Sequence, residues 1–267
     1  MTQGPAATTP ATTACAGEDA IVSLAHVTLS YGDLRALDDV SLNVRRGERL
    51  CVLGANGSGK STLASVICGL LAPDAGEVAL VGEKAFANGA ADFDAYRRAR
   101  RKLGLVFQNP EDQIVTSVVE EDVAFGPENL GLPPERIEHL VRRELHRVAM
   151  ERYAKADPAR LSGGQKQRLC IARAVLRKPK ILILDDSTSA VDTATDAKIR
   201  GALKTALPGT TKLIIAQRIT SVMDADLILV MDDGHISATG THEELMAQSD
   251  IYREVYRSQQ EGVSIDG

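Results

Sequence analysis

The chain has 267 residues, of which 44% are apolar, 25% charged and 3% aromatic. This is ordinary globular usage, with room for one large domain or two closely packed subdomains whose core rests on aliphatic side chains. The formal net charge of −5 argues against a nucleic-acid binder that works by bulk electrostatics.

The first segment, residues 1–20, is rich in Ala, Thr and Pro and contains no Lys or Arg. It lacks the basic and apolar regions of a secretory signal, so we predict a disordered tail there, and a short flexible tail at residues 258–267. No apolar run approaches the roughly 18 residues that a membrane helix needs. The four cysteines form no CxxC pair, which argues against zinc or a disulfide framework and favours a reducing cytosol.

From residue 21 onward, short β-branched strands alternate with helical stretches, a pattern that predicts an α/β fold. A helix is expected from Ser61 to about Leu71, and a charged helical stretch between Leu132 and Leu161 is typical of an inserted helical subdomain. Buried strands are expected at residues 50–53, 103–107, 181–184, 212–216 and 227–231.

A phosphate-binding pattern, G-x-x-x-x-G-K-[ST], follows the first of these strands at residues 54–61. Glycines let the backbone wrap closely enough for successive N–H groups to point at phosphate oxygens, and the next helix adds its positive end. Lys60 should reach the β- and γ-phosphates of ATP, and the Ser61 hydroxyl should ligate Mg²⁺. The predicted nucleotide-binding residues are Gly54, Asn56, Gly57, Ser58, Gly59, Lys60, Ser61 and Thr62.

The strand at residues 181–184 runs into two aspartates, Asp185 and Asp186. An acidic residue at the end of a buried strand is the second half of a phosphoryl-transfer site. Asp185 would hold Mg²⁺ directly or through water, and Asp186 would orient the attacking water. The alternative, a surface acidic turn, is disfavoured because a phosphate-binding loop is present.

The motif Leu161-Ser162-Gly163-Gly164-Gln165, together with these elements, resembles the signature of ATP-binding cassette (ABC) ATPases. The resemblance covers about residues 21–257. It implies a P-loop NTPase fold with a RecA-like core, an antiparallel β subdomain and a helical subdomain at about residues 110–175.

The resemblance also implies roles for single residues. Tyr31 would stack on adenine, Gln108 would ligate Mg²⁺ and sense the membrane subunit, and Asp192 would lie at a dimer seam. In the implied head-to-tail dimer, ATP held by one phosphate loop is covered by the signature of a second ABC ATPase subunit. The Ser162 hydroxyl and the following helix can offer donors to a γ-phosphate, which agrees with this arrangement. The chain would work with an integral membrane transporter subunit, peripherally, on the cytoplasmic face of the membrane.

Two regions resemble different branches of this family. Residues 107–113 and 121–129 look like energy-coupling-factor and cobalt-type importer ATPases, whose cassettes are separate chains. The C-terminal third resembles the impaired-site cassette of heterodimeric exporters, because Asp186 and Gln217 stand where such importers usually carry Glu and His. An importer subunit is the leading interpretation. The alternatives are an exporter cassette, a regulatory nucleotide-binding subunit without turnover, and a soluble cassette acting in translation or DNA repair.

Both departures bear on catalysis. The Asp186 carboxylate would sit roughly 1.5 Å further from the water than that of Glu, and a displacement near 1 Å can cost about 10²-fold in rate. Gln217 can donate a hydrogen bond to the γ-phosphate but cannot carry the charge of an imidazole. We hypothesise that this chain's own site binds ATP but hydrolyses it slowly, while its signature completes the site of a different partner chain.

A run of basic residues at 97–102 is interpreted as a solvated helix face. Contact with anionic lipid or with a membrane subunit is the alternative for this run.

Overall fold

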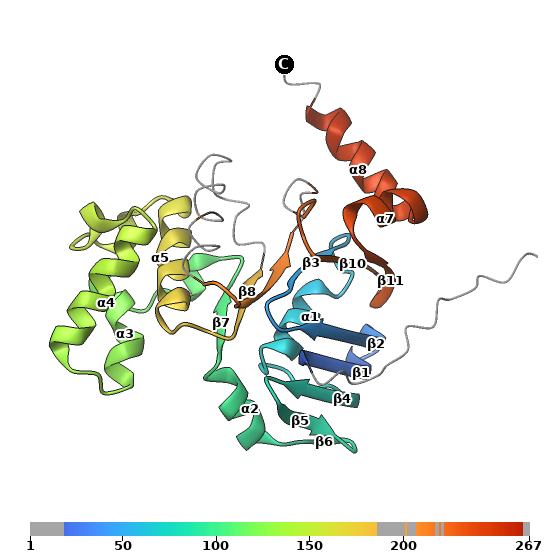
Figure 1. Ribbon diagram of the computed structural model, residues 1–267, viewed down its shortest axis with the longest axis horizontal. Helices are drawn as coiled ribbons and strands as arrows, with labels where there is room; N and C mark the ends of the chain where they lie inside the picture. Colours follow the sequence, from blue (N-terminus) through green and yellow to red (C-terminus); the bar gives the residue numbers. More distant parts are fainter. Residues whose placement is uncertain (1–18, 186–200, 202–206, 217–218, 220–221, 264–267) are drawn as a thin grey trace, which may run out of the picture.

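The computed structural model describes residues 19–185, 201, 207–216, 219 and 222–263, and every statement below concerns these residues. Two β-sheets lie beside each other, and a helical lobe extends from one edge of the second sheet (Figure 1). The helices are α1 (Lys60–Ile67), α2 (Phe93–Arg100), α3 (Val119–Asn129), α4 (Pro134–Arg147), α5 (Gly163–Leu176), α7 (His242–Gln248) and α8 (Asp250–Val263).

The first sheet is antiparallel and has the strand order β2-β1-β4-β5-β6. Its long strands alternate buried and exposed side chains, as expected of a sheet that packs on one face. Its members are β1 (Ala20–Tyr31), β2 (Leu34–Arg45), β4 (Ala75–Leu80), β5 (Glu83–Ala87) and β6 (Ala90–Ala91).

The second sheet has the order β11-β10-β3-β9-β8-β7, and its strands are parallel except for the edge strand β11. Continuous apolar runs such as that of β8 suit strands that are covered on both faces. The strands are β3 (Arg49–Leu53), β7 (Leu103–Val106), β8 (Ile181–Asp185), β9 (Thr211–Ile215), β10 (Leu227–Asp232) and β11 (His235–Gly240). The five strands predicted from sequence are therefore confirmed, each within one residue at its ends.

Helix α1 lies between the two sheets, and its apolar residues share one core cluster with both of them. It ends at Ile67, earlier than the predicted Leu71. Gly69 has φ +67°, and the Leu70 N–H donates to the Ser65 carbonyl, so a left-handed glycine closes the helix.

Helices α3, α4 and α5 enclose a second apolar cluster of their own beside β7 and β8. Short 3₁₀ turns connect these elements at η1 (Pro110–Asp112), η2 (Glu151–Tyr153) and η3 (Pro158–Arg160). At the other side of the molecule, α7 and α8 pack on β10 through Tyr252 and Leu245. Helix α8 continues to Val263, so helical structure extends into the tail expected from residue 258. No helix in the described ranges has the length and apolar character needed to cross a bilayer.

Candidate functional site

The glycine-rich loop follows β3, which pairs with parallel strands on both sides. Gly54 has φ +155° and Gly59 has φ +96°. A Cβ on Gly54 would lie 2.3 Å from the Met231 carbonyl oxygen, and one on Gly59 would lie 2.4 Å from that of Ala36. Backbone conformation and close approach therefore both require glycine at these two positions.

The turn between β10 and β11 supports the loop from behind. The Gly234 N–H donates to the Ser58 carbonyl at 3.3 Å, and the Asp38 N–H of β2 donates to Gly234 at 3.0 Å. The loop is thus held by neighbours that lie far away in the sequence, which favours a fixed cradle of N–H groups.

The Lys60 side chain is buried within this cradle, with 8% of the residue exposed. Its ammonium donates to the Ala55 carbonyl at 2.6 Å and lies 3.4 Å from the Ser58 hydroxyl. Lys60 is also the first residue of α1, so a cation and a helix N-terminus occupy the same place. Both favour an anion there.

Two predicted residues beyond the loop, Asp185 and Gln108, lie at the carboxyl edge of the second sheet. Strands β3, β9, β8 and β7 are neighbours and parallel, so their carboxyl ends lie side by side. Asp185 ends β8, and Gln108 follows β7.

Asp185, Gln108, Tyr31 and most of the phosphate loop line one pocket of about 440 Å³. Tyr31 stands at its rim with 50% of its surface exposed, next to Leu34 on the following strand. The pocket is lined by Tyr31, Leu34, Arg35, Ala36, Asn56, Gly57, Gly59, Lys60, Ser61, Thr62, Gln108, Asp185, Ile215 and Asp233. An exposed aromatic ring at one end and a phosphate cradle at the other suit a nucleotide.

Asp185 brings a partly desolvated carboxylate to the helix start. Burial raises the pKa of Asp185 above its ordinary value, while a hydrogen bond from the Ser61 hydroxyl and the charge of Lys60 act in the opposite direction. The site therefore offers a carboxylate, a hydroxyl and the Gln108 amide in one pocket.

The motif at residues 161–165 starts the signature helix α5. Ser162 is the N-cap: its hydroxyl accepts from the Gln165 N–H, and its own N–H donates to the Gln165 side chain at 2.9 Å. Ser162 and Gly163 are exposed. None of the five signature residues, Leu161, Ser162, Gly163, Gly164 and Gln165, is among the described residues that line the nucleotide-site pocket.

Three predicted residues lie outside the described part of the chain: Asp186, Gln217 and Asp192. Sequence reasoning assigned no single role to Gln113, Asp122, Gln167 and Arg173, which hold the segment after Gln108 in place. Contacts such as that between Asp122 and Arg173 join α3 to α5, which lie far apart in the sequence. They therefore cannot be recognised from a local spacing of residues.

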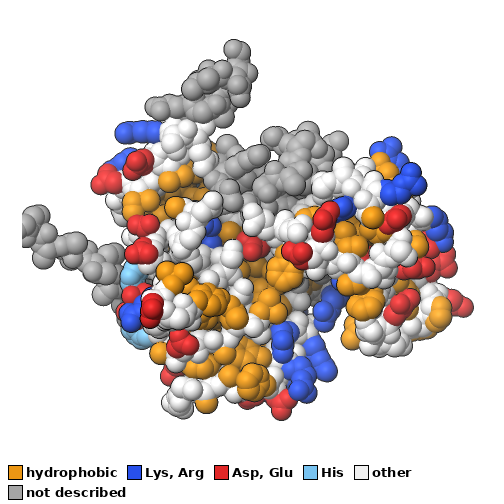
Figure 2. Space-filling model, turned by 180° about the vertical axis from the view of Figure 1, so that it is seen from behind, with side chains coloured by type: hydrophobic (Ala, Val, Ile, Leu, Met, Phe, Trp, Pro, Cys, Tyr) orange, Lys and Arg blue, Asp and Glu red, His pale blue; other side chains and the backbone are white. Residues whose placement is uncertain are grey.

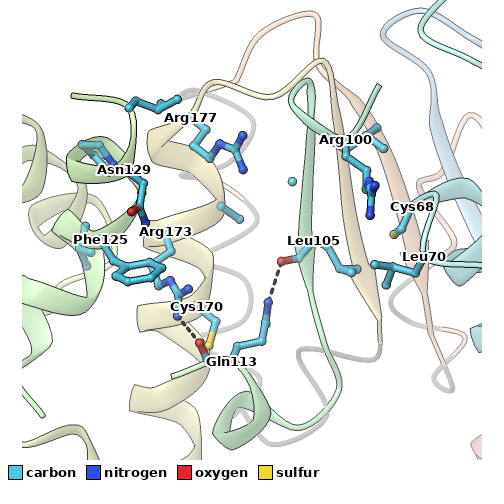
Figure 3. A pocket seen from close by; sticks show the side chains of 17 residues that line it. Cys68, Leu70, Arg100, Leu105, Gln113, Phe125, Asn129, Cys170, Arg173 and Arg177 are labelled. Atoms are coloured by element: carbon cyan, nitrogen blue, oxygen red, sulfur yellow. Dashed lines mark hydrogen bonds between the residues drawn. The ribbon is translucent and has the colours of Figure 1, made fainter. Parts of the chain in front are cut away.

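A second pocket, of about 430 Å³, separates the helical lobe from the sheets; we call it the interlobe pocket. Leu70 and Cys68 approach it from the α1 side, and Phe125 from α3 (Figure 3). Figure 2 shows Lys and Arg side chains beside the hollow between the two lobes. Arg100 of the basic run 97–102 lines this pocket, whereas Arg97, Arg98 and Lys102 pair with Asp94 or Glu83.

Comparison with known proteins agrees with this geometry. The model of the ABC transporter family matches residues 37–189. A Bifidobacterium longum protein named as an ABC transporter ATP-binding protein is 47% identical over 216 residues, covering 80% of this chain; the aligned part spans 28% of that relative. The energy-coupling factor transporter ATP-binding protein EcfA1 of Streptococcus pyogenes is 41% identical over 236 residues, covering 86% of this chain and 82% of that protein.

Solved structures show the same fold. CbiO1 of Clostridium perfringens, part of the ABC transporter complex CbiONQ, has a TM-score of 0.77 at 30% identity and covers 94% of this chain and 100% of that one. An ATP-binding cassette in a dimeric post-hydrolysis state with ADP and Pi has a TM-score of 0.75 at 32% identity, covering 82% and 98%. The chain belongs to the ABC transporter family, as a nucleotide-binding ATPase of that family.

Proposed function

We propose that this chain is the ATP-binding and ATP-hydrolysing subunit of an importer of the energy-coupling-factor type. One observation carries the proposal: the phosphate loop, Asp185, Gln108 and Tyr31 line a single pocket. The importer type rests on the likeness to EcfA1, an energy-coupling factor transporter ATP-binding protein, and CbiO1, a part of the ABC transporter complex CbiONQ, supports the role of a separate cassette subunit. ATP binding by this subunit would drive the movement of substrate through membrane subunits.

The pocket supports a definite placement of ATP. The triphosphate would lie against the N–H groups of residues 57–62, with Lys60 at the β- and γ-phosphates. The adenine would stack on the Tyr31 ring at the rim. Gly54 and Ser58 shape the loop from beneath, since Ser58 is buried and Gly54 abuts β10.

The residues present fit Mg²⁺. Ser61, Asp185 and Gln108 line the same pocket, and the Ser61 hydroxyl acts to lower the pKa of Asp185. A hydroxyl, a carboxylate and an amide carbonyl form the oxygen donor set that Mg²⁺ prefers. Bound there, Mg²⁺ would neutralise charge on the β- and γ-phosphates. Asp185 would then be held as the anion, which opposes the effect of its burial.

A second cassette subunit would complete the site. Ser162 and Gly163 are exposed at the start of α5 and lie outside this chain's own pocket. They are therefore available to cover a nucleotide on a neighbouring subunit, with the α5 N-terminus as an added donor group. The dimeric cassette with ADP and Pi supports this arrangement by homology. The second subunit is proposed to be a different chain, and Asp192 to lie at the seam.

The interlobe pocket is proposed to receive a segment of the integral membrane subunit. Its wall combines exposed apolar side chains, including Leu70, Phe125 and Leu130, with Arg100 and Arg177. Neither arginine pairs with a carboxylate in the described part of the chain, and no acidic residue lines the pocket there. We infer a partner segment that carries apolar residues and a carboxylate, and we place the chain peripherally on the cytoplasmic face of the membrane.

Co-purification of the chain with its integral membrane subunit tests this placement. The charge reversals Arg100→Glu and Arg177→Glu should abolish capture of the membrane subunit while leaving ATP binding intact. Arg142→Glu on α4, which is exposed and pairs with Glu138 on the same helix, is the matched control and should have no effect. Equal capture by all variants contradicts the docking proposal.

An exporter cassette remains the second candidate, because Asp186 and Gln217 match the impaired-site pattern of such proteins. The composition of the purified complex separates the two. A small substrate-binding membrane protein in the complex supports import, and a second full-length half-transporter supports export.

A further inference from the structure

The segment that follows Gln108 is folded back onto its own strand. The Gln113 side chain accepts a hydrogen bond from the Phe107 N–H at 2.9 Å and donates one to the Leu105 carbonyl at 3.1 Å. Figure 3 shows this side chain reaching across to β7. The two bonds fix the exit of β7 on one side of Gln108.

A buried carboxylate fixes the other side of the segment. Asp122, at the start of α3, has 0% of its surface exposed. It accepts from the Val115 N–H at 2.9 Å, from the Thr116 N–H at 3.3 Å and from the Arg173 guanidinium at 3.0 Å. A buried charge is costly unless it is paired and hydrogen-bonded, and the side-chain partners of Asp122 in the described part of the chain all belong to this segment or to α5.

We call Asp122 and its hydrogen bonds to Val115, Thr116 and Arg173 the clamp. Arg173 belongs to α5 and so joins the clamp to the signature helix. The same guanidinium nitrogen that binds Asp122 also donates to the Gln113 carbonyl, and the second contact is visible in Figure 3. Closer to the start of α5 than Arg173, the Gln167 amide donates to the Phe107 carbonyl at 3.3 Å and Lys166 pairs with Glu111. Side chains from α5 therefore contact the segment at several points along its length.

The geometry points to a positioning role for Asp122 and Arg173: they hold the Gln108 segment in fixed relation to the signature helix α5. Gln108 faces the nucleotide pocket, while Arg173 and Gln113 line the interlobe pocket. One hydrogen-bonded unit thus touches this chain's proposed Mg²⁺ site, the proposed docking pocket and the helix whose start serves the partner's nucleotide. The inference rests on the proposed function, because that function gives the three sites their roles. The statement that Asp122 and Arg173 order the segment rests on their hydrogen-bond geometry alone.

Asp122→Asn tests the clamp with little change of shape. The Asn oxygen can still accept from Val115, but its amide meets Arg173 donor to donor. Loss of a hydrogen bond to a charged group corresponds to about 10- to 100-fold, so amide exchange at Val115 and Thr116 should accelerate by at least about tenfold. The apparent affinity for Mg²⁺ in the ATP complex should fall by a similar factor, whereas ATP binding without Mg²⁺ should change by less than about twofold.

Glu144→Gln is the matched control. Glu144 is 1% exposed and also pairs with arginines, Arg143 and Arg147, but all three lie on α4, away from the Gln108 segment. This variant should lower thermal stability without changing amide exchange at Val115 or the Mg²⁺ affinity. Arg173→Lys keeps a cation that can donate to both acceptors, so its Mg²⁺ affinity should lie between those of wild type and Arg173→Met.

Amide exchange and Mg²⁺ affinity also give the results that would contradict the inference. Unchanged exchange at Val115 and unchanged Mg²⁺ affinity in Asp122→Asn would overturn it, and so would equal changes in Glu144→Gln. If wild-type protein bound no ATP, the proposed function would fail, and the exchange experiment alone would then decide whether Asp122 orders the segment.

Discussion

Ser61 at the start of α1 and Asp185 at the end of β8 line the same pocket, where the Ser61 hydroxyl acts to lower the pKa of the Asp185 carboxyl group. These residues come from the two halves of the nucleotide-site pattern, and strand β9 separates β8 from β3 in the sheet. Their shared pocket shows that the fold alone brings the two proposed Mg²⁺ ligands together. Lys60 lies beside them, so the cluster combines opposite charges where a metal and a triphosphate would meet.

Lys60→Ala should weaken ATP binding by about 10- to 100-fold, because hydrogen bonds to a charged group contribute roughly 1.5–3 kcal/mol. Equilibrium titration with ATP and Mg²⁺ checks this. Lys84→Ala, which removes an exposed cation on β5, should bind as wild type does. Equal affinity for both variants would show that the triphosphate does not contact Lys60.

Gly59→Ala and Gly57→Ala separate a steric clash from backbone strain within one loop. Both glycines have positive φ, which costs a residue with a side chain about 1–2 kcal/mol. Only at Gly59 would the new Cβ meet a backbone atom, at 2.4 Å from the Ala36 oxygen, whereas Gly57 has open space. The free energy of unfolding, measured in urea, should therefore fall further for Gly59→Ala. An equal loss would mean that β2 yields to the added methyl group.

Ser162→Ala should leave ATP binding to the isolated chain unchanged and reduce hydrolysis by the assembled transporter, because the signature lies outside this chain's pocket. The lost N-cap costs about 1 kcal/mol of stability. Thr241→Ala removes the equivalent capping box from α7 and should cost as much stability with normal hydrolysis. Weaker ATP binding to the isolated Ser162→Ala chain would place the signature on its own nucleotide.

The double variant Asp186→Glu with Gln217→His should raise single-turnover hydrolysis at this chain's own site by up to about 10²-fold, since the longer carboxylate restores the reach to the attacking water. Rapid quench with radiolabelled ATP in the assembled transporter measures it. The Lys60→Ala background supplies the control, because a chain with weakened ATP binding should gain much less when ATP is below saturation. An unchanged rate would mean that Asp186 already serves as well as Glu.

The strands and the phosphate loop were predictable because local signals define them. A four-residue apolar run, a glycine pattern and a following helix suffice for β3 and residues 54–61. The end of α1 was predicted too late because the apolar pattern continues through Leu70 and Leu71, while Gly69 already turns the chain. Asp122 illustrates what sequence could not reveal: its meaning depends on Arg173, which only the packing of α3 against α5 brings within 3.0 Å.

The position of Arg100 in the interlobe pocket could not be predicted from the sequence either, because it too depends on packing. Four other basic residues surround it in the run 97–102, and three of them, Arg97, Arg98 and Lys102, are paired on α2 or β5 as a solvated helix face would be. Which basic side chain faces the helical lobe depends on how α2 packs against the rest of the fold. The local periodicity of the sequence does not reveal this packing.

Amide hydrogen exchange of the wild-type chain, with and without ATP and Mg²⁺, tests the central claim most directly. The account predicts saturable binding of ATP, with slowed exchange concentrated in residues 54–62 and at Asp185. Absence of binding, or protection confined to segments away from the pocket between Tyr31 and Gln108, would contradict it.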